Sequence, residues 1–240
     1  MKIALTTITY EGKHYAFHDW LCAIYALALP EGVKLDIIVA DNSKNKAYYQ
    51  YLSQHKWGFK KVIYSNPKNK TQVEVMAQSQ NAVTDYAKLN SYDYIFNVEA
   101  DIIVKPETLT KLLSHQRQVV GGLYMHGTNL QKILMQDSEK DGYEIATWNV
   151  EASYSMIVAN GKLKRFHSIG IGCLLMQIGI FEHIRWRYDN NQDCYPDSLF
   201  NEDLVRANIP VFGDTSLIQT HLNQDWANNP HTLKKTLKNA

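Results

Sequence analysis

The sequence predicts one α/β domain in which a mostly parallel sheet is covered by helices on both of its faces. Two observations favour this fold class. The chain has 240 residues, of which 45% are hydrophobic, so it contains enough apolar material for one large core. Short apolar segments rich in β-branched residues alternate with longer segments of helical character. In sheets of this kind ligands bind beyond the carboxyl ends of the strands, so the residues that follow each strand are the functional candidates.

The first half of the chain shows this alternation regularly. We expect a strand over residues 3–10 and then a helix over 14–29, which Pro30 and Gly32 end. After a second strand over 34–40, the residues Asp41, Asn42 and Ser43 are of the types that turn a chain and cap the helix that follows. The other elements predicted in this half are a strand at 61–64, a helix at 72–90 and a strand at 94–98.

The second half is less regular. Residues 126–168 mix Gly, Asn, Asp and Trp with short strand-like pieces such as 143–148, and we expect an insertion there instead of a separate domain. The tail from residue 228 to residue 240 is expected to be a solvated helix or a frayed end. The regular elements predicted in this half are a helix from Pro106 to about 113, strands at 119–124, 169–176 and 211–212, and helices at 180–184 and 202–207.

Composition excludes several classes of function. With 25 Lys and Arg against 24 Asp and Glu, the net charge of +1 provides no field that would gather nucleic acid or an anionic membrane. The three cysteines, Cys22, Cys173 and Cys194, are odd in number and lack the CxxC spacing of a zinc site or the pairing of a disulfide framework. No segment has the pattern of a signal peptide or of a membrane span. We therefore expect a cytoplasmic protein.

The strongest chemical signal is a pair of acids, Glu99 and Asp101, directly after the strand at 94–98. Carboxylate oxygens are the ligands that Mg²⁺ and Mn²⁺ prefer, and an ion held in this way can also bridge the phosphates of a nucleotide. In the alternative interpretation, Asp101 caps the next turn and Glu99 faces the solvent. The spacing of the two acids is compatible with both interpretations.

Four segments in this order resemble the nucleotide-sugar glycosyltransferases of the GT-A fold, most closely the inverting family 2. Residues 94–109, with the sequence YIFNVEADIIVKPETL, look like that family's strand, acidic metal motif and Pro-started helix. Glu99 stands where the family's Asp-x-Asp motif usually has its first Asp. The other three segments are 169–184, similar to the Gly-rich strand and helix of the acceptor side, 201–204, similar to the Glu-Asp motif, and 211–221, similar to the closing strand with a terminal His.

The resemblance implies an enzyme that moves a hexosyl or pentosyl group from a UDP- or GDP-sugar to an acceptor, with inversion at the anomeric carbon. Mn²⁺ or Mg²⁺ would be held by Asp101, Glu99 and His221, because the charge of the diphosphate leaving group must be compensated. Asp203 would be the catalytic base, and Glu202 beside it would have an orienting or acceptor-binding role. Both acids are also of the type that the first turn of a helix favours for its dipole alone.

For the nucleotide, the resemblance implies contacts with the loop after the first strand, at Thr7, Thr9 and Tyr10. It also implies that Asp41 recognises the base or the ribose. In the alternative interpretation these residues have only a structural role, because threonine favours strands and Asp41 is typical of a turn.

Residues 1–240 would form one GT-A-like domain, with a donor half over about 1–105, an acceptor half over about 106–225 and a tail over 226–240. The class of the acceptor stays open between glycan, lipid, protein and nucleic acid. A function of a different class is a non-catalytic GT-A-like module that binds a nucleotide or a glycan, although the complete set of acids favours the enzyme. A dinucleotide-dependent dehydrogenase is disfavoured because the first strand-to-helix loop lacks GxGxxG.

Overall fold

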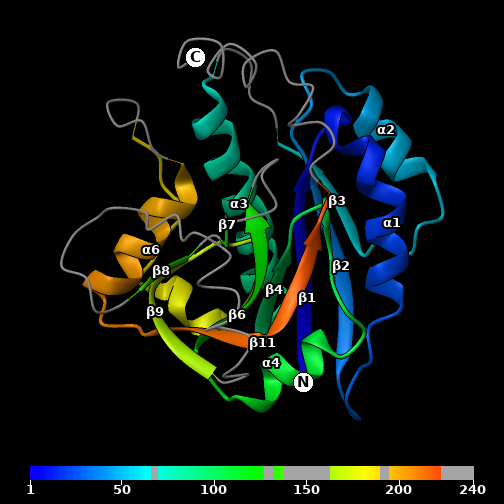
Figure 1. Ribbon diagram of the computed structural model, residues 1–240. Helices are drawn as coiled ribbons and strands as arrows, with labels where there is room; N and C mark the ends of the chain where they lie inside the picture. The colour runs from blue at the N-terminus through cyan, green and yellow to red at the C-terminus, as the bar shows by residue number, and fades with distance from the viewer. Residues whose placement is uncertain (66–69, 127–131, 134, 138–162, 190–194, 223–240) are drawn as a thin grey trace, which may run out of the picture.

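A continuous sheet organises the computed structural model, which describes residues 1–65, 70–126, 132–133, 135–137, 163–189 and 195–222 (Figure 1). The spatial order of its main strands is β3-β2-β1-β4-β10-β6-β11-β9-β8, while β5 pairs with β11 and β7 pairs with β6. In sequence order the strands are β1 (Lys2–Thr9), β2 (Lys34–Asp41), β3 (Lys61–Tyr64), β4 (Tyr94–Val98), β5 (Ile102–Ile103), β6 (Val119–His126), β7 (Lys132–Ile133), β8 (Met135–Asp137), β9 (Leu163–Ile169), β10 (Cys173–Gln177) and β11 (Val211–His221).

Most of the main strands run in one direction. The pairs β3-β2, β2-β1, β1-β4 and β6-β11 are parallel, and only β9 and β10 run against the other strands of the main path. The predicted fold class, a mostly parallel α/β sheet, is therefore confirmed. Because β1, β2 and β4 are parallel neighbours, the residues that follow them meet at one edge of the sheet.

Helices cover both faces of this sheet, as Figure 1 shows. One apolar core lies between the sheet and α3 (Gln72–Leu89), η2 (Ile178–Glu182) and α6 (Pro196–Arg206). The second core lies on the opposite face, under α1 (His14–Tyr25), α2 (Ala47–Gln54) and α4 (Thr108–Ser114), and the short η1 (Glu11–Lys13) leads into α1. None of the helices in the described part of the chain is long and apolar enough to cross a membrane.

Local sequence explains where two of these helices begin. Thr71 precedes α3 and accepts a hydrogen bond on its side chain from the backbone N–H of Glu74 at 3.3 Å, which is the Thr-x-x-Glu arrangement of a helix start. Pro196 opens α6, at a position where a missing N–H costs nothing. The helix predicted at 202–207 therefore begins earlier than expected, at Pro196.

Three further sequence expectations differ from the structure. The helix predicted over 14–29 ends at Tyr25, because the backbone N–H of Ala28 bonds to the carbonyl of Pro106 at 2.8 Å instead of continuing the helix. Asp41, Asn42 and Ser43 do not cap α2, since the side chain of Asn45 accepts the N–H of Ala47 at its start. The strand predicted at 211–212 continues to His221 as β11.

The segment 126–168, predicted as irregular, contains β7, β8 and most of β9 in its described part. The strand predicted over 169–176 divides into the end of β9 and β10, with a turn at residues 171–172. The strand-like piece at 143–148 and the tail at 226–240 lie outside the described residues.

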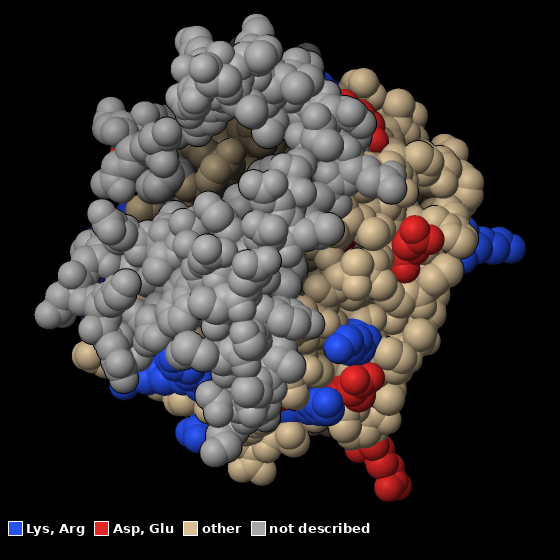
Figure 2. Space-filling view, in the orientation of Figure 1, with Lys and Arg blue, Asp and Glu red and all other residues tan. Residues whose placement is uncertain are grey.

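Charged side chains of the described residues are scattered over the face in Figure 2, with Lys and Arg interspersed among Asp and Glu. No patch of a single sign dominates the described part of this face. This distribution agrees with the balanced charge of the sequence.

A buried carboxylate, that of Asp214, joins β11 to the end of α4. The carboxylate of Asp214 contacts His115 Nε2 at 2.8 Å and accepts two hydrogen bonds from Ser216, one from its hydroxyl at 2.6 Å and one from its N–H at 2.9 Å. Burial acts to raise the pKa of Asp214, but the bonds from Ser216 and His115 outweigh it and leave the pKa below its usual value. The ionised form of Asp214 is therefore favoured by the folded state.

We predict that Asp214→Asn lowers the free energy of unfolding by about 1–3 kcal/mol at neutral pH, because a buried charged acceptor is lost. The lowered pKa means that the contribution of Asp214 is complete above the ordinary Asp pKa of about 4 and is lost as the pH falls through the folded value. Urea unfolding at several pH values measures both effects. The exposed pair of Asp85 with Arg185 supplies the control, since Asp85→Asn is expected to cost less than about 0.5 kcal/mol. Equal losses in the two variants, or a difference that grows in acid, contradict the prediction.

Candidate active site

The acid pair predicted from the sequence lies at the edge of the sheet where β4 ends. Directly after it, β5 pairs with the end of β11, so that Ile102 faces His221 in the ladder. The backbone N–H of Leu222 also bonds to the carbonyl of Asp101 at 2.8 Å. This short antiparallel pairing brings together two parts of the chain that are 120 residues apart, and it leaves His221 Nε2 3.3 Å from Asp101 Oδ2.

Glu99, Asp101 and His221 form a cluster whose potential ligand atoms all lie within 4.8 Å of one another. Two carboxylates and an imidazole are a donor set that suits Mn²⁺ and related divalent ions. Asp101 has no exposed surface, and its Oδ1 atom is buried without a hydrogen-bond partner among the described residues. A buried carboxylate oxygen with no partner is costly unless a cation or a donor reaches it. The residues present therefore fit a divalent ion.

The two acids of this cluster have opposite electrostatic environments. Burial, followed by the negative charge of Asp101, raises the pKa of Glu99 above its usual value. Burial also acts to raise the pKa of Asp101, but His221 and Lys13 outweigh it and hold that pKa below its usual value. Asp101 is thus the carboxylate that remains ionised, and Glu99 is the one that gains most from an added cation.

Two residues from the segment after β1 complete the surroundings of Asp101. The ammonium group of Lys13, at the end of η1, forms an ion pair with Asp101 Oδ2. The hydroxyl of Tyr15 lies 3.4 Å from the same oxygen and donates to the carbonyl of Leu222 at 2.5 Å. Sequence reasoning did not identify either residue, because a lysine at the start of a helix is usually a solvated surface residue.

The imidazole of His221 is held from the other side by Tyr124. The two rings meet edge to face, with centroids 5.5 Å apart and planes at 88°. The Tyr124 hydroxyl accepts a hydrogen bond from the N–H of Gly172 at 2.9 Å, and a Cβ atom at Gly172 would lie 2.7 Å from the tyrosine ring. Gly172 is therefore required for the placement of Tyr124, which in turn orients His221.

The predicted nucleotide contacts lie at the same edge of the sheet. Thr9 and Asp41 are direct partners in the parallel ladder of β1 and β2, and both are buried. Thr7 is also buried, two residues earlier on β1, whereas Tyr10 follows the strand and has 41% of its surface exposed. Since β1 lies between β2 and β4, the strand that ends in Asp41 is two inter-strand spacings, or roughly 10 Å, from the strand that leads to Glu99 and Asp101.

The carboxylate of Asp41 is held in place by Ser43. Its Oδ1 accepts the hydroxyl of Ser43 at 2.6 Å and the backbone N–H of the same residue at 3.1 Å. Burial raises the pKa of Asp41, against the effect of these two bonds. Ordinary turn chemistry accounts for the Ser43 contacts, while full burial at the end of a parallel strand is unusual for a turn residue.

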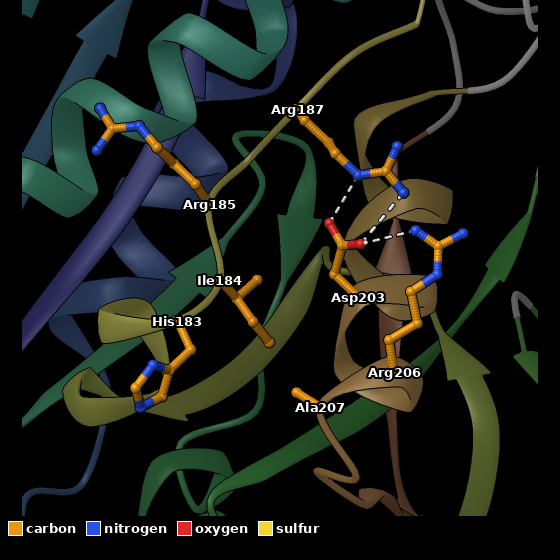
Figure 3. Close-up of a pocket in the computed structure, with 7 residues that line it drawn as sticks. All are labelled: His183, Ile184, Arg185, Arg187, Asp203, Arg206 and Ala207. Atoms are coloured by element: carbon orange, nitrogen blue, oxygen red, sulfur yellow. Dashed lines mark hydrogen bonds and ion pairs between the residues drawn. The ribbon is translucent and has the colours of Figure 1, made fainter.

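Glu202 and Asp203, the predicted catalytic acids, lie on α6 in ion pairs with two arginines. Arg187 Nε contacts Asp203 Oδ2 at 2.7 Å and Arg187 Nη2 contacts Glu202 Oε2 at 3.2 Å, while Arg206 reaches both acids at 3.5 Å. Asp203 lines an open hollow of about 450 Å³ between α6 and the segment that follows η2. Figure 3 shows Arg187 and Arg206 converging on Asp203, with His183 and Arg185 across the hollow. The contacts of these two acids are with the arginines and not with the cluster around Asp101.

A different acid of α6, Asp197, acts on that cluster through its charge. Its negative charge is near enough to raise the pKa of Glu99, and burial raises the pKa of Asp197 itself although part of its surface is exposed. Asp197 and Asp203 are six residues apart, which places them roughly 9 Å apart along the helix and about 120° apart around it. They therefore face different surroundings.

Asn201 fixes the first turn of α6 against β9. Its amide group donates to the carbonyl of Asp197 at 2.8 Å and to the carbonyl of Ile169 at 3.0 Å, and its oxygen accepts the N–H of Ile169 at 3.1 Å. The helix predicted at 202–207 left Asp197 outside it. The helix-opening Pro196 was the signal that could have placed it at a helix start instead.

Comparison with known proteins identifies the fold. No family model matches the chain, and no curated protein matches it in sequence. Among solved structures, TarS of S. aureus, residues 1–349, has a TM-score of 0.55 at 14% identity, over 93% of this chain and 58% of that one. TarS has also been solved with UDP-GlcNAc. GalNAc-T7, solved with UDP, GalNAc and Mn²⁺, has a TM-score of 0.65 at 9% identity, over 92% of this chain and 44% of that one.

A third similar structure, A197 from STIV, has a TM-score of 0.50 at 10% identity and is covered over 86% of its length. The chain thus spans about half the length of the TarS and GalNAc-T7 chains that it matches, at 58% and 44%. At these identities the likeness establishes the fold alone. It is the GT-A-like fold of TarS and GalNAc-T7, as the resemblance in the sequence predicts.

Proposed function

We propose that the protein is a metal-dependent glycosyltransferase that uses a nucleoside-diphosphate sugar, most simply a UDP-sugar, as its donor. The observation that carries this proposal is the meeting of two sets of residues at one sheet edge. Thr9 and Asp41 end the adjacent parallel strands β1 and β2. Glu99 and Asp101 follow the next parallel strand, β4, and His221 joins them from the end of β11. Because β2 and β4 lie two inter-strand spacings apart, or roughly 10 Å, only an elongated ligand reaches both sets.

The two ends of this site have separate tasks in the proposal. Thr9 and Asp41, with Thr7 and Tyr10 nearby, bind the nucleoside. A divalent ion, Mn²⁺ or Mg²⁺, supplies charge compensation for the diphosphate as the bond to the sugar breaks. Asp101, Glu99 and His221 would hold this ion. The donor half of the domain would then correspond to residues 1–105, and the acceptor half to residues 106–225.

Inversion at the anomeric carbon needs one carboxylate opposite the leaving group, placed to accept the proton of the attacking hydroxyl. Asp203 is the residue that the sequence resemblance assigns to this task, with Glu202 beside it. We infer that Asp197 is the better candidate, because Asp203 is paired with Arg187 whereas the charge of Asp197 acts on Glu99. Burial raises the pKa of Asp197, which suits a general base.

The alternative function, a non-catalytic module of the same fold, would bind a nucleotide without turnover. A screen of UDP- and GDP-sugars with and without Mn²⁺ distinguishes the two, because hydrolysis of the donor needs no knowledge of the acceptor. Binding of nucleoside diphosphates without any hydrolysis or transfer favours the module.

We predict that UDP or GDP binds at least about 10-fold more tightly with Mn²⁺ than with chelator, and that Asp101→Ala abolishes this difference. The reason is that Asp101 is the ionised, fully buried carboxylate of the cluster. Isothermal titration calorimetry measures the affinities. Asp85→Ala, at an exposed acid paired with Arg185, is the control and keeps the Mn²⁺ effect. If the unmodified protein binds UDP or GDP equally tightly with Mn²⁺ and with chelator, the proposed role of the metal is wrong.

We further predict that Asp197→Asn keeps the donor affinity but lowers the rate of donor hydrolysis or transfer by about 100-fold or more. Asp203→Asn is expected to change the rate much less, since its carboxylate serves the pair with Arg187. Steady-state rates and donor affinities of the two variants decide between the acids. If Asp203→Asn lowers the rate strongly and Asp197→Asn lowers it little, Asp203 is the catalytic base.

A further inference from the structure

The ammonium group of Lys13 pairs with the carboxylate of Asp101, which the proposed function makes a metal ligand. Asp101 has no exposed side-chain surface, and the Lys13 side chain is itself only 19% exposed. A carboxylate at such a depth needs a compensating positive charge to remain ionised. In the protein alone, Lys13 supplies that charge.

The position of Lys13 makes it a competitor of the metal. Its ammonium group has three donors and no lone pair, so it can never serve as a ligand. It contacts the Oδ2 atom of Asp101, which also lies 3.3 Å from Nε2 of His221. An ion shared by Asp101 and His221 would therefore lie beside the ammonium group, and two cations at such a distance repel one another in a poorly solvated site.

The ammonium group of Lys13 can also move away from Asp101. It is the last residue of η1, in the segment between β1 and α1, and its four-carbon stem allows the ammonium group to move while the backbone stays in place. The anion that arrives with the metal in the proposed reaction is a diphosphate, and lysine is a common partner of phosphate oxygens as a point charge. The displaced ammonium group thus has a new partner only when the nucleotide is present.

We propose that Lys13 is an internal counter-cation that occupies the metal-free site and is displaced when a divalent ion binds, so that metal and nucleoside diphosphate bind cooperatively. This inference rests on the proposed function, because it assigns Asp101 to the metal. It goes further by naming the residue that limits metal affinity. A divalent ion alone binds weakly because it must displace Lys13. The nucleotide raises the affinity for the ion because its diphosphate becomes the new partner of the Lys13 ammonium group.

The test compares Mn²⁺ binding by calorimetry in the absence of nucleotide. Lys13→Met, which keeps the length of the side chain and removes its charge, is expected to bind Mn²⁺ about 10-fold or more tightly than the unmodified protein. Lys13→Arg keeps a permanent charge and is expected to bind no more tightly than the unmodified protein. Lys34→Met removes an exposed lysine paired with Asp36 at the start of β2 and is the matched control, with unchanged Mn²⁺ affinity.

Thermal unfolding supplies a second readout. In chelator, Lys13→Met is expected to melt at a lower temperature than the unmodified protein, because Asp101 is left without its cation, and saturating Mn²⁺ should remove most of the difference. UDP should tighten Mn²⁺ binding by a larger factor in the unmodified protein than in Lys13→Met.

Mn²⁺ affinity in Lys13→Met that is equal to or weaker than that of the unmodified protein overturns the proposal, as does an absence of Mn²⁺ binding in both. Tighter Mn²⁺ binding by Lys13→Met supports it even where no nucleotide binds. Failure of UDP and GDP to bind the unmodified protein contradicts the proposed function instead, so the two failures are distinguishable.

Discussion

The negative charge of Asp101 lies at a position with no exposed surface, and the elements around the site are arranged to keep that charge stable. The end of β4 delivers Asp101 to the sheet edge, the pairing of β5 with β11 brings His221 beside it, and the segment after β1 contributes Lys13 and Tyr15. Each of these contacts joins a different part of the chain to the same carboxylate. A fold that keeps an ionised carboxylate buried at this point must supply a positive charge to it, from a side chain or from a bound ion.

The parallel arrangement of β2, β1 and β4 places further candidate binding residues at the same sheet edge as Asp101. Because the three strands end at one edge, the ladder holds Thr9 and Asp41 at a fixed spacing from the end of β4, and the turn of Glu99 and Asp101 follows directly. Rigid strands position functional groups more closely than loops do. Asn201 fixes the first turn of α6 to β9, and the charge of Asp197 in that turn acts on Glu99. The far end of α6 is occupied by the arginine pairs of Glu202 and Asp203.

The parts of the fold that depend on local sequence could be predicted, and the parts that depend on long-range pairing could not. The strands β3 and β4 match their predicted ranges because their apolar residues are bounded by polar ones, and the acid pair follows directly from its place after β4. His221 could be placed near Asp101 only through the family resemblance, since the two-residue strand β5 leaves no periodic signal. Lys13 and Asp197 look like ordinary surface residues in the sequence. Only the folded chain shows that Lys13 pairs with Asp101 and that the charge of Asp197 acts on Glu99.

A crystal structure of the protein with UDP and Mn²⁺ tests the central claim most directly, because it locates both ends of the nucleotide at once. The account predicts that the uridine lies against Thr9 and Asp41, and that the diphosphate and the ion lie at Asp101 and His221. A nucleotide bound elsewhere, such as in the hollow lined by Arg187 and Arg206, or an ordered ion away from Asp101, contradicts it.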